Sequence, residues 1–171
     1  MPAGLYYITE KNNTIYMENK TDKTKERKVV VANRWRTPDG TILESLHQHD
    51  YVSHTDKITG EYYFVDGGIS YVRTSINKVP MTNCCVYSTD PIAGVRKYFK
   101  RGTFDANKKR ICVLLKNLSD KHIQNILRDL ISQGTDITDP VPVQYVRELA
   151  YRFENNDHVE EHDYIQIDSE K

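Results

Sequence analysis

Several features that would assign the protein to a large class are missing from its sequence. The chain has 3 cysteines, and the adjacent Cys84 and Cys85 would point to opposite faces of a strand, which argues against a disulfide framework. No apolar run approaches the roughly 20 residues that cross a bilayer, and no charged-then-apolar leader opens the sequence. We therefore expect a cytoplasmic protein with reduced thiols and no membrane partner.

Net charge is absent as well. The 24 basic and 24 acidic side chains cancel, so no overall field steers the protein toward nucleic acid or membranes. The length of 171 residues fits one domain with a sizeable core. Tryptophan occurs once but tyrosine 12 times, and rings that carry a hydroxyl suit partly exposed sheet faces and interfaces.

What the sequence does contain, in its first half, is a series of β-prone runs. Residues 4–18 are typical of a hairpin with an Asn-rich turn, and residues 19–28 are charged without an apolar face. The densest aromatic stretch, residues 35–73, consists of short strands separated by turns. These turns lie at residues 38–40, 55–60 and 66–68. Closely spaced strands with tight turns predict a small antiparallel β-meander or a partly open barrel.

Helix signals replace strand signals after Tyr87. Residues 90–91, Asp-Pro, predict the start of a first helix, and Gly102 predicts its end. Ser119 predicts the N-cap of a second helix, whose apolar positions recur at helical spacing from Ile123 onward. Strands followed by helices predict an α+β fold, in which two to three helices pack on one face of the antiparallel sheet.

A last helix is predicted from Asp139, and an acidic segment follows it. The residues expected to face inward from this helix are Val143, Val146, Leu149, Ala150 and Phe153. We expect three parts: a hairpin and charged linker over residues 1–28, a single α+β domain over residues 29–154, and an acidic tail over residues 155–171.

The first group of residues with possible chemistry is His47, His49 and Asp50. On a regular strand the two imidazoles would share one face, where they could bind a metal, while the carboxylate would point the other way. A catalytic zinc site usually needs a third protein ligand, and His54 would lie on the opposite face. A metal-assisted hydrolase acting on a nucleotide or nucleic acid is therefore an alternative, and ordinary strand histidines explain the pattern more simply.

The second group is a block of cations between residues 94 and 116, with one opposing carboxylate. Aromatic residues interleave with these cations, a mixture that suits phosphate contacts and base stacking. Cations late in a helix also complement its dipole, and the acidic tail could neutralise them. The candidate phosphate-contacting residues are Arg96, Lys97, Lys100, Arg101, Lys108, Lys109 and Arg110.

No catalytic residue is predicted. The chain has no serine nucleophile elbow, no kinase motif set and no Walker A loop, and turn geometry explains its Asp-Gly sequences. The cysteines are interpreted as buried small hydrophobic residues, because no spacing supplies a base for a nucleophile. No cofactor is expected.

Taken together, several blocks of the chain resemble a family of small, largely uncharacterised accessory proteins of tailed bacteriophages, including T4-like phages. The blocks are WRTPDGT, HxHDYVSHTD and GEYYFVDGGISYVR, followed by YSTDP, RGTFD and LSDKHIQNIL. The similarity spans residues 30–153 and leaves out the opening hairpin and the acidic tail. It implies a protein made in the cytoplasm of an infected bacterium and dispensable for building the virion, and it supplies no catalytic residue.

The leading interpretation is a non-enzymatic protein that binds a host or defence-related target, either a protein or a nucleotide signal, and inhibits or redirects it. Large aromatics and arginine make strong anchor contacts, and turns on a rigid sheet hold such residues in place. A nucleic-acid-binding module that uses the basic block is a further alternative. The predicted contact residues are Trp35, Arg36, His47, His49, Asp50, Tyr51, Asp66 and Arg73.

Overall fold

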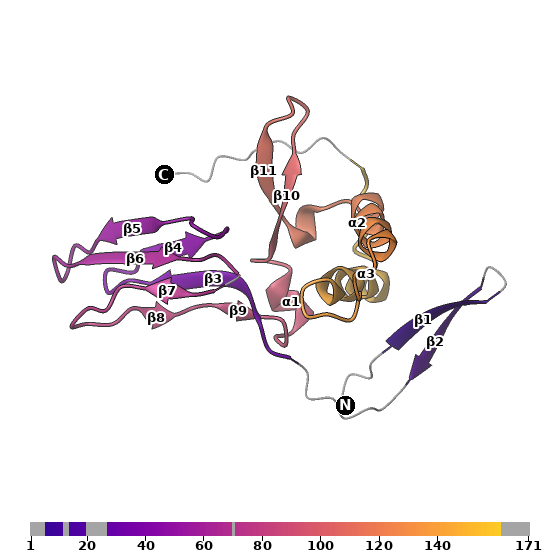
Figure 1. Ribbon diagram of the computed structural model, residues 1–171, viewed down its shortest axis with the longest axis horizontal. Helices are drawn as coiled ribbons and strands as arrows, with labels where there is room; N and C mark the ends of the chain where they lie inside the picture. The colour runs from indigo at the N-terminus through magenta and orange to yellow at the C-terminus, as the bar shows by residue number, and fades with distance from the viewer. Residues whose placement is uncertain (1–5, 12–13, 20–26, 70, 162–171) are drawn as a thin grey trace.

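The structure is a computed structural model that describes residues 6–11, 14–19, 27–69 and 71–161. Its described part is an α+β fold, as predicted, with antiparallel strands in open sheets and three α-helices (Figure 1). None of the described helices has the length and apolar character required to span a membrane. Two halves can be distinguished: a strand half over residues 30–83 and a helical half over residues 86–155.

The central strand of the fold is β3 (Val30–Arg36), which follows from a run of β-branched residues. On one side it pairs antiparallel with β4 (Ile42–Ser45). On the other side it pairs with β8 (Thr82–Asn83) near its end and with β9 (Val86–Tyr87) near its start. The predicted turn at residues 38–40 joins β3 to β4, and Gly40 has the positive φ that such a turn requires.

A second sheet consists of β5 (Val52–Thr55), β6 (Tyr62–Asp66) and β7 (Arg73–Thr74), in that order. Both of its ladders are antiparallel. Side chains from the two sheets form a small shared core, which identifies their inward faces. The buried members of this core are Leu43, Tyr63, Val65 and Met81, and Trp35 and Val52 pack against them.

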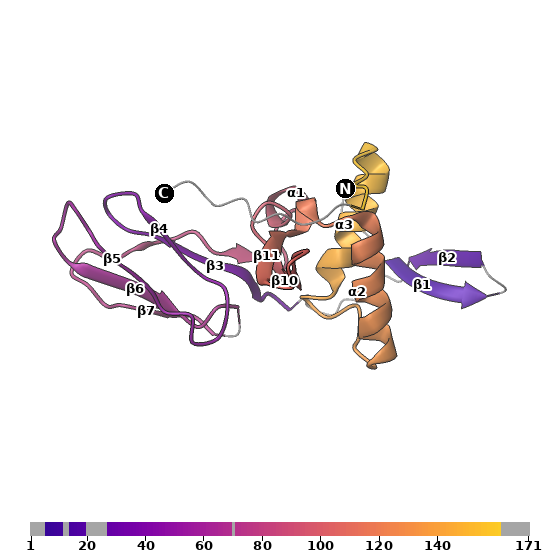
Figure 2. The same cartoon turned by 90° about the horizontal axis from the view of Figure 1, so that it is seen from above.

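The helical half contains the larger core. Its elements are α1 (Ile92–Val95), the hairpin of β10 (Lys100–Phe104) and β11 (Arg110–Leu114), the 3₁₀ turn η1 (Leu115–Asn117), α2 (Asp120–Ser132) and α3 (Val143–Asn155). Val31, Ala32 and Val86 also enter this core, so the helices pack on the start of β3 and on β9. The helices therefore lie beyond one end of the strand half (Figures 1 and 2).

The helix signals gave mixed results. Ser119 caps α2 as predicted, because its hydroxyl accepts a hydrogen bond from the backbone N–H of His122. The first predicted helix is wrong beyond its opening turn, since α1 ends at Val95 and Gly102 lies inside strand β10. Pairing with β11 overrides the local helix signal, because that pairing places Ile111 and Val113 in the core.

The predicted inward face of α3 is right in part. Leu149 packs against the larger core, whereas Ala150 is exposed and Phe153 is 81% exposed. The fully buried side chains of the helix are Gln144, Tyr145, Glu148 and Arg152. Ion pairs and hydrogen bonds compensate the buried polar groups, so the hydrophobic pattern alone did not locate the buried side of the helix.

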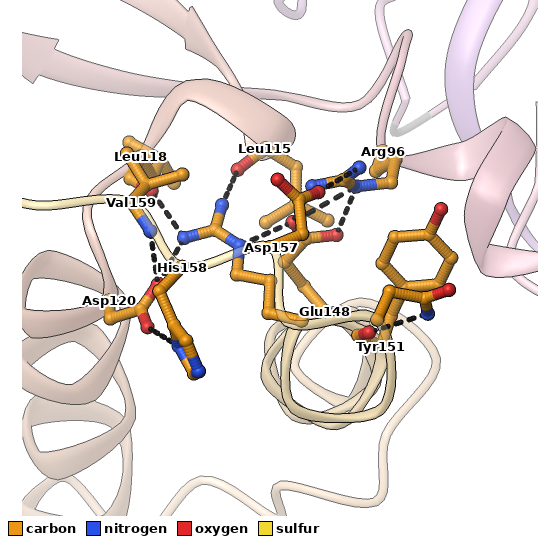
Figure 3. A network of polar contacts seen from close by, with 11 residues as sticks. Arg96, Leu115, Leu118, Asp120, Glu148, Tyr151, Asp157, His158 and Val159 are labelled. Atoms are coloured by element: carbon orange, nitrogen blue, oxygen red, sulfur yellow. Dashed lines mark hydrogen bonds and ion pairs between the residues drawn. The ribbon is translucent and has the colours of Figure 1, made fainter.

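Arg152 is the centre of a buried polar network in this half. Figure 3 shows this network, with Arg96, Asp120 and Glu148 labelled among its members. The Arg152 guanidinium donates to Glu148 Oε1 at 2.7 Å, to Asp120 Oδ1, and to the carbonyl oxygens of Leu115 and Leu118 at 3.0 and 2.7 Å. Arg96 donates to the same Glu148 carboxylate at 2.8 Å. The network therefore joins α3 to η1, to the start of α2 and to the residue that follows α1.

The segment after α3 closes this network on one side. Burial acts to raise the pKa of Asp120. The hydrogen bonds from Arg152 and His158 outweigh this effect and hold the pKa of Asp120 below its usual value. Asp157 pairs with Arg96 at 2.8 Å, and the Asp120 N–H donates to the Val159 carbonyl at 2.9 Å. The first part of the predicted acidic tail thus packs on the helices, and residues 162–171 lie outside the described part.

The opening hairpin is formed by β1 (Tyr6–Lys11) and β2 (Thr14–Asn19), as predicted. Among the described strands, these two pair with each other alone. The hairpin stands apart from both halves (Figures 1 and 2). Most of the predicted charged linker lies outside the described residues.

Candidate functional site

The outward side of the β5–β6–β7 sheet carries a cluster of aromatic residues and one arginine. Alternation along β6 turns Tyr63 and Val65 inward, where both are 0% exposed, and turns Tyr62 and Phe64 outward. Tyr51 precedes β5, and Arg73 begins β7. We call Tyr51, Tyr62, Phe64 and Arg73 the aromatic face.

Direct contacts hold the side chains of the aromatic face together. The rings of Tyr51 and Phe64 stack, with centroids 5.1 Å apart and planes inclined by 24°. The guanidinium of Arg73 lies 5.5 Å from the centroid of Phe64. This geometry combines ring stacking with a cation–π contact, and it leaves Tyr62 52% exposed beside them.

The two tyrosine hydroxyls of the aromatic face differ in their chemistry. Tyr51 donates a hydrogen bond of 3.4 Å to the Tyr62 hydroxyl, and this bond raises the pKa of Tyr51. Hydrogen bonds from Ser53 and then from Tyr51 lower the pKa of Tyr62. Tyr51 already donates its proton to Tyr62, so the Tyr62 hydroxyl keeps its own proton to donate to a partner.

The turn at residues 66–68 supports one end of the aromatic face. Asp66 is buried and lies opposite Arg73 in the β6–β7 ladder. Its carboxylate accepts the Gly67 N–H at 2.7 Å. Gly68 has a φ of 56°, and a Cβ there would lie 2.7 Å from the backbone of His47. Ser45 Oγ accepts the Gly68 N–H at 2.8 Å, which ties this turn to β4. Glycine is thus required where the two loops touch.

A second set of contacts locks the turn after β3 to the turn between β5 and β6. Asp39 Oδ2 accepts from His54 Nε2 at 2.7 Å and from the Lys57 N–H at 2.9 Å. Its other oxygen accepts from the Thr37 hydroxyl at 2.7 Å. In return, the Asp39 N–H donates to Asp56 at 2.7 Å. The hydrogen bonds from His54, Lys57 and Thr37 hold the pKa of Asp39 well below its usual range.

Two of the residues predicted to make contacts, Tyr51 and Arg73, belong to the aromatic face, whereas Asp66 lies next to Arg73 in the sheet but is buried. Trp35 lies elsewhere: it packs against the small core, and its indole N–H donates to Asn33 Oδ1 at 3.0 Å. Arg36 is exposed on the other side of β3, since neighbouring strand residues point to opposite faces.

His47, His49 and Asp50 lie in the loop between β4 and β5, so the assumption of a regular strand there is wrong. His49 has a φ of 66°, a turn conformation, and the Asp50 N–H donates to the His47 carbonyl. Asp50 itself accepts the Leu46 N–H at 2.7 Å. Across the described ranges, no three His, Cys, Asp or Glu side chains converge as a metal site would require.

The predicted basic block does not form a single patch. Arg96 is committed to Glu148 and Asp157, and Lys100 pairs with Glu44 at 2.7 Å. Lys97 lies after α1, and Arg101 lies on the opposite face of β10 from Lys100. The remaining three cations, Lys108, Lys109 and Arg110, lie at the far end of the β10–β11 hairpin.

Sequence reasoning missed Tyr62 and Phe64. The signal was present, because an inward Tyr63 and Val65 in a five-residue strand require outward neighbours on both sides. Cys85, in contrast, has a pKa raised by burial, which disfavours the thiolate and any role as a nucleophile.

A small hollow lies where the two halves meet. It encloses about 30 Å³ between β4, the loop after it and the base of β10, with Glu44, His47, Tyr98, Lys100 and Cys112 among its lining residues. Ligand pockets usually measure about 300–1,000 Å³, so this hollow has no room for a nucleotide.

Comparison with known proteins gave no relative whose role could be carried over. A scan against protein-family models, a search of curated proteins and a search of solved structures each found no match. The function of this chain has to be inferred from the geometry described above.

Proposed function

We propose that the protein binds a partner protein through the aromatic face and carries out no chemistry of its own. The observation that supports this most strongly is where apolar surface is exposed. Of the thirteen large hydrophobic side chains exposed among the described residues, eight lie between residues 51 and 79, and two of these, Tyr51 and Tyr62, belong to the aromatic face and contact each other. Exposed apolar side chains that lie together mark protein interaction sites, and tyrosine and arginine are among the residues that most often carry binding energy.

The support behind the aromatic face favours the same proposal. Tyr63, on the inward side of β6, is fully buried and donates to the Val79 carbonyl at 2.6 Å. The loop and turn contacts made by Ser45 and Asp39 hold both ends of the sheet. A face that is ordered before binding loses little conformational entropy on association, which raises affinity.

The resemblance to phage accessory proteins favours one class of target for this proposal. That class is a host or defence-related protein whose activity is blocked or redirected in the bacterial cytoplasm. Of the two target classes considered, a protein fits better than a nucleotide signal, because exposed aromatic residues on a sheet suit a macromolecule and the hollow at Glu44 holds only about 30 Å³.

The test is an affinity purification from infected bacteria, followed by binding measurements with each purified candidate. The doubly substituted variant Tyr62→Ser/Arg73→Ser removes two members of the aromatic face. The matched control, Phe153→Ser/Lys121→Ser, removes an exposed aromatic and an exposed cation from the helical half. We expect the first variant to lose on the order of 100-fold in affinity, since truncating an anchor residue costs about 1–2 kcal/mol, and the control to bind normally.

Equal affinity of the wild type and the Tyr62→Ser/Arg73→Ser variant for every captured protein would contradict the proposal. So would a loss of the same size in the control variant, because the binding energy would then come from a surface on the helical half.

A further inference from the structure

The β10–β11 hairpin is a second feature that points to a ligand, and it is independent of the aromatic face. It projects away from the sheets and helices, with its connecting turn at the far end (Figure 1). The turn and the strand ends beside it carry Phe104, Lys108 and Arg110. We call these three residues the basic finger.

The register of the hairpin assigns its residues to two different faces. Arg101 and Thr103 share one face with Ile111 and Val113, both of which are buried in the larger core. Phe104 pairs with Arg110 on the other face. Phe104 is 65% exposed, so this large ring contributes little to folding at its present position.

Arg110 lies flat along this outer face. A Cβ placed on Gly102 would be 3.5 Å from both Nε and Nη2 of Arg110, which locates the guanidinium over the glycine. Within the part of the chain that the structure describes, Arg110 forms no ion pair. An aromatic ring and a guanidinium are thus presented side by side on the exposed face of a two-stranded ribbon.

The carboxylate of Asp105 is bound to the backbone of the turn. Asp105 Oδ1 accepts the backbone N–H groups of Asn107 and Lys109, at 2.9 and 2.8 Å. The Lys108 N–H donates to the Asp105 carbonyl, and Lys108 adopts a φ of 61°. Asp105 therefore shapes the turn that presents Lys108, and its charge offsets one of the two positive charges of the finger.

We propose that the basic finger binds single-stranded nucleic acid, with Lys108 and Arg110 contacting phosphates and Phe104 stacking on an unpaired base. Cations that follow a backbone together with an exposed aromatic ring are the combination used for single strands. A duplex keeps its bases stacked on one another, so Phe104 would find no partner there. Since the protein has a formal net charge of +0, such binding has to come from this local surface.

The experiment measures fluorescence anisotropy of a labelled 20-nucleotide oligothymidylate with the full-length protein at several salt concentrations. Two phosphate contacts give a slope of log K against log salt of about −1.4, which is about a sevenfold weakening between 50 and 200 mM salt. We expect Lys108→Glu/Arg110→Glu to abolish this salt-dependent binding. A charge reversal on α2, Arg128→Glu, is the control and should change the affinity less than twofold.

A second pair of variants tests the stacking contact. Phe104→Ser should weaken binding about tenfold with an unchanged salt slope, because loss of one base stack costs roughly 1–3 kcal/mol. Phe153→Ser, at an equally exposed ring on α3, should have no effect. Circular dichroism of each variant establishes that the fold is retained.

Three results would overturn the proposal. The first is tighter binding of a matched duplex than of the single strand. The second is an equal effect of Arg128→Glu and the finger variant, which would indicate diffuse charge. The third is binding to anionic phosphatidylglycerol vesicles without binding to the oligonucleotide, which would assign the finger to a lipid surface. None of these outcomes depends on whether the aromatic face binds a protein.

Discussion

In the helical half, Arg152 is fully buried and donates to four acceptors, whereas in the strand half Arg73 lies at the surface over the ring of Phe64. The aromatic rings differ in the same way. Tyr145 is buried in the larger core, but Tyr62 is half exposed beside Tyr51. Residues of one chemical kind thus stabilise the fold in one half and remain available to a partner in the other.

Arginine and tyrosine occur in both halves, so residue type alone does not identify a binding surface. A buried charge has to be paired by the protein itself, and the Arg152 network achieves this with two carboxylates and two carbonyls. An exposed arginine on an aromatic ring has no such requirement and can exchange water for a partner. The predictions that follow test this division, from the largest expected effect on stability to the smallest.

Glu148→Ala should cause the largest loss, about 3–5 kcal/mol in the free energy of unfolding. The substitution leaves the guanidinium of Arg152 buried without its one fully buried carboxylate partner, and breaking a buried pair by removing one partner is strongly destabilising. Urea denaturation measures this loss in the free energy of unfolding. As a control, Glu161→Ala breaks the solvent-exposed pair with Lys121 and should cost under about 1 kcal/mol. Similar losses in the two variants would refute the structural role of the network.

Leu43→Ala, in the smaller core, should cost about 3 kcal/mol, because it leaves a cavity between the two sheets. This variant also tests the prediction of a single domain over residues 29–154. Trp35 fluorescence reports the strand half and far-ultraviolet circular dichroism reports the helices. Since β3 contributes to both cores, we expect the two probes to give one midpoint. Separate midpoints would show that the halves unfold independently.

Asp39→Asn should cause a smaller decrease in the urea midpoint, and this decrease should depend on pH. The folded-state pKa of Asp39 is lowered by its hydrogen bonds with His54, Lys57 and Thr37. Its contribution is therefore present above the unfolded-state pKa of about 3.9 and is lost as pH falls below that value. The wild type and the variant should differ at pH 7 and converge toward pH 2. A difference in urea midpoint that stays constant from pH 7 to pH 2 would argue against a stabilising role for the hydrogen bonds of the Asp39 carboxylate.

Much of the fold could be predicted because its signals are local. The Asp-Gly turns, the Ser119 cap and the period-2 strands depend on neighbours in the sequence. The face of α3 could not be predicted, since burial of Glu148 and Arg152 depends on partners that are distant in the sequence. The strand through Gly102 was also not predicted, because its pairing with β11 competes with a local helix signal.

The candidate site was predictable in part. Tyr51, Asp66 and Arg73 were expected at a contact surface because they flank turns of the meander, and the structure places them close together. Trp35 was expected there for its size, but large rings also fill cores, and sequence alone does not say which sheet face is covered.

The most direct test of the account compares stability and binding in one variant, Tyr62→Ser/Arg73→Ser. Both side chains are exposed, so we expect this variant to lose under about 1 kcal/mol in the free energy of unfolding. Its affinity for the partner protein should nevertheless fall on the order of 100-fold. A folded variant that retains wild-type affinity would contradict the claim that the aromatic face is the binding surface.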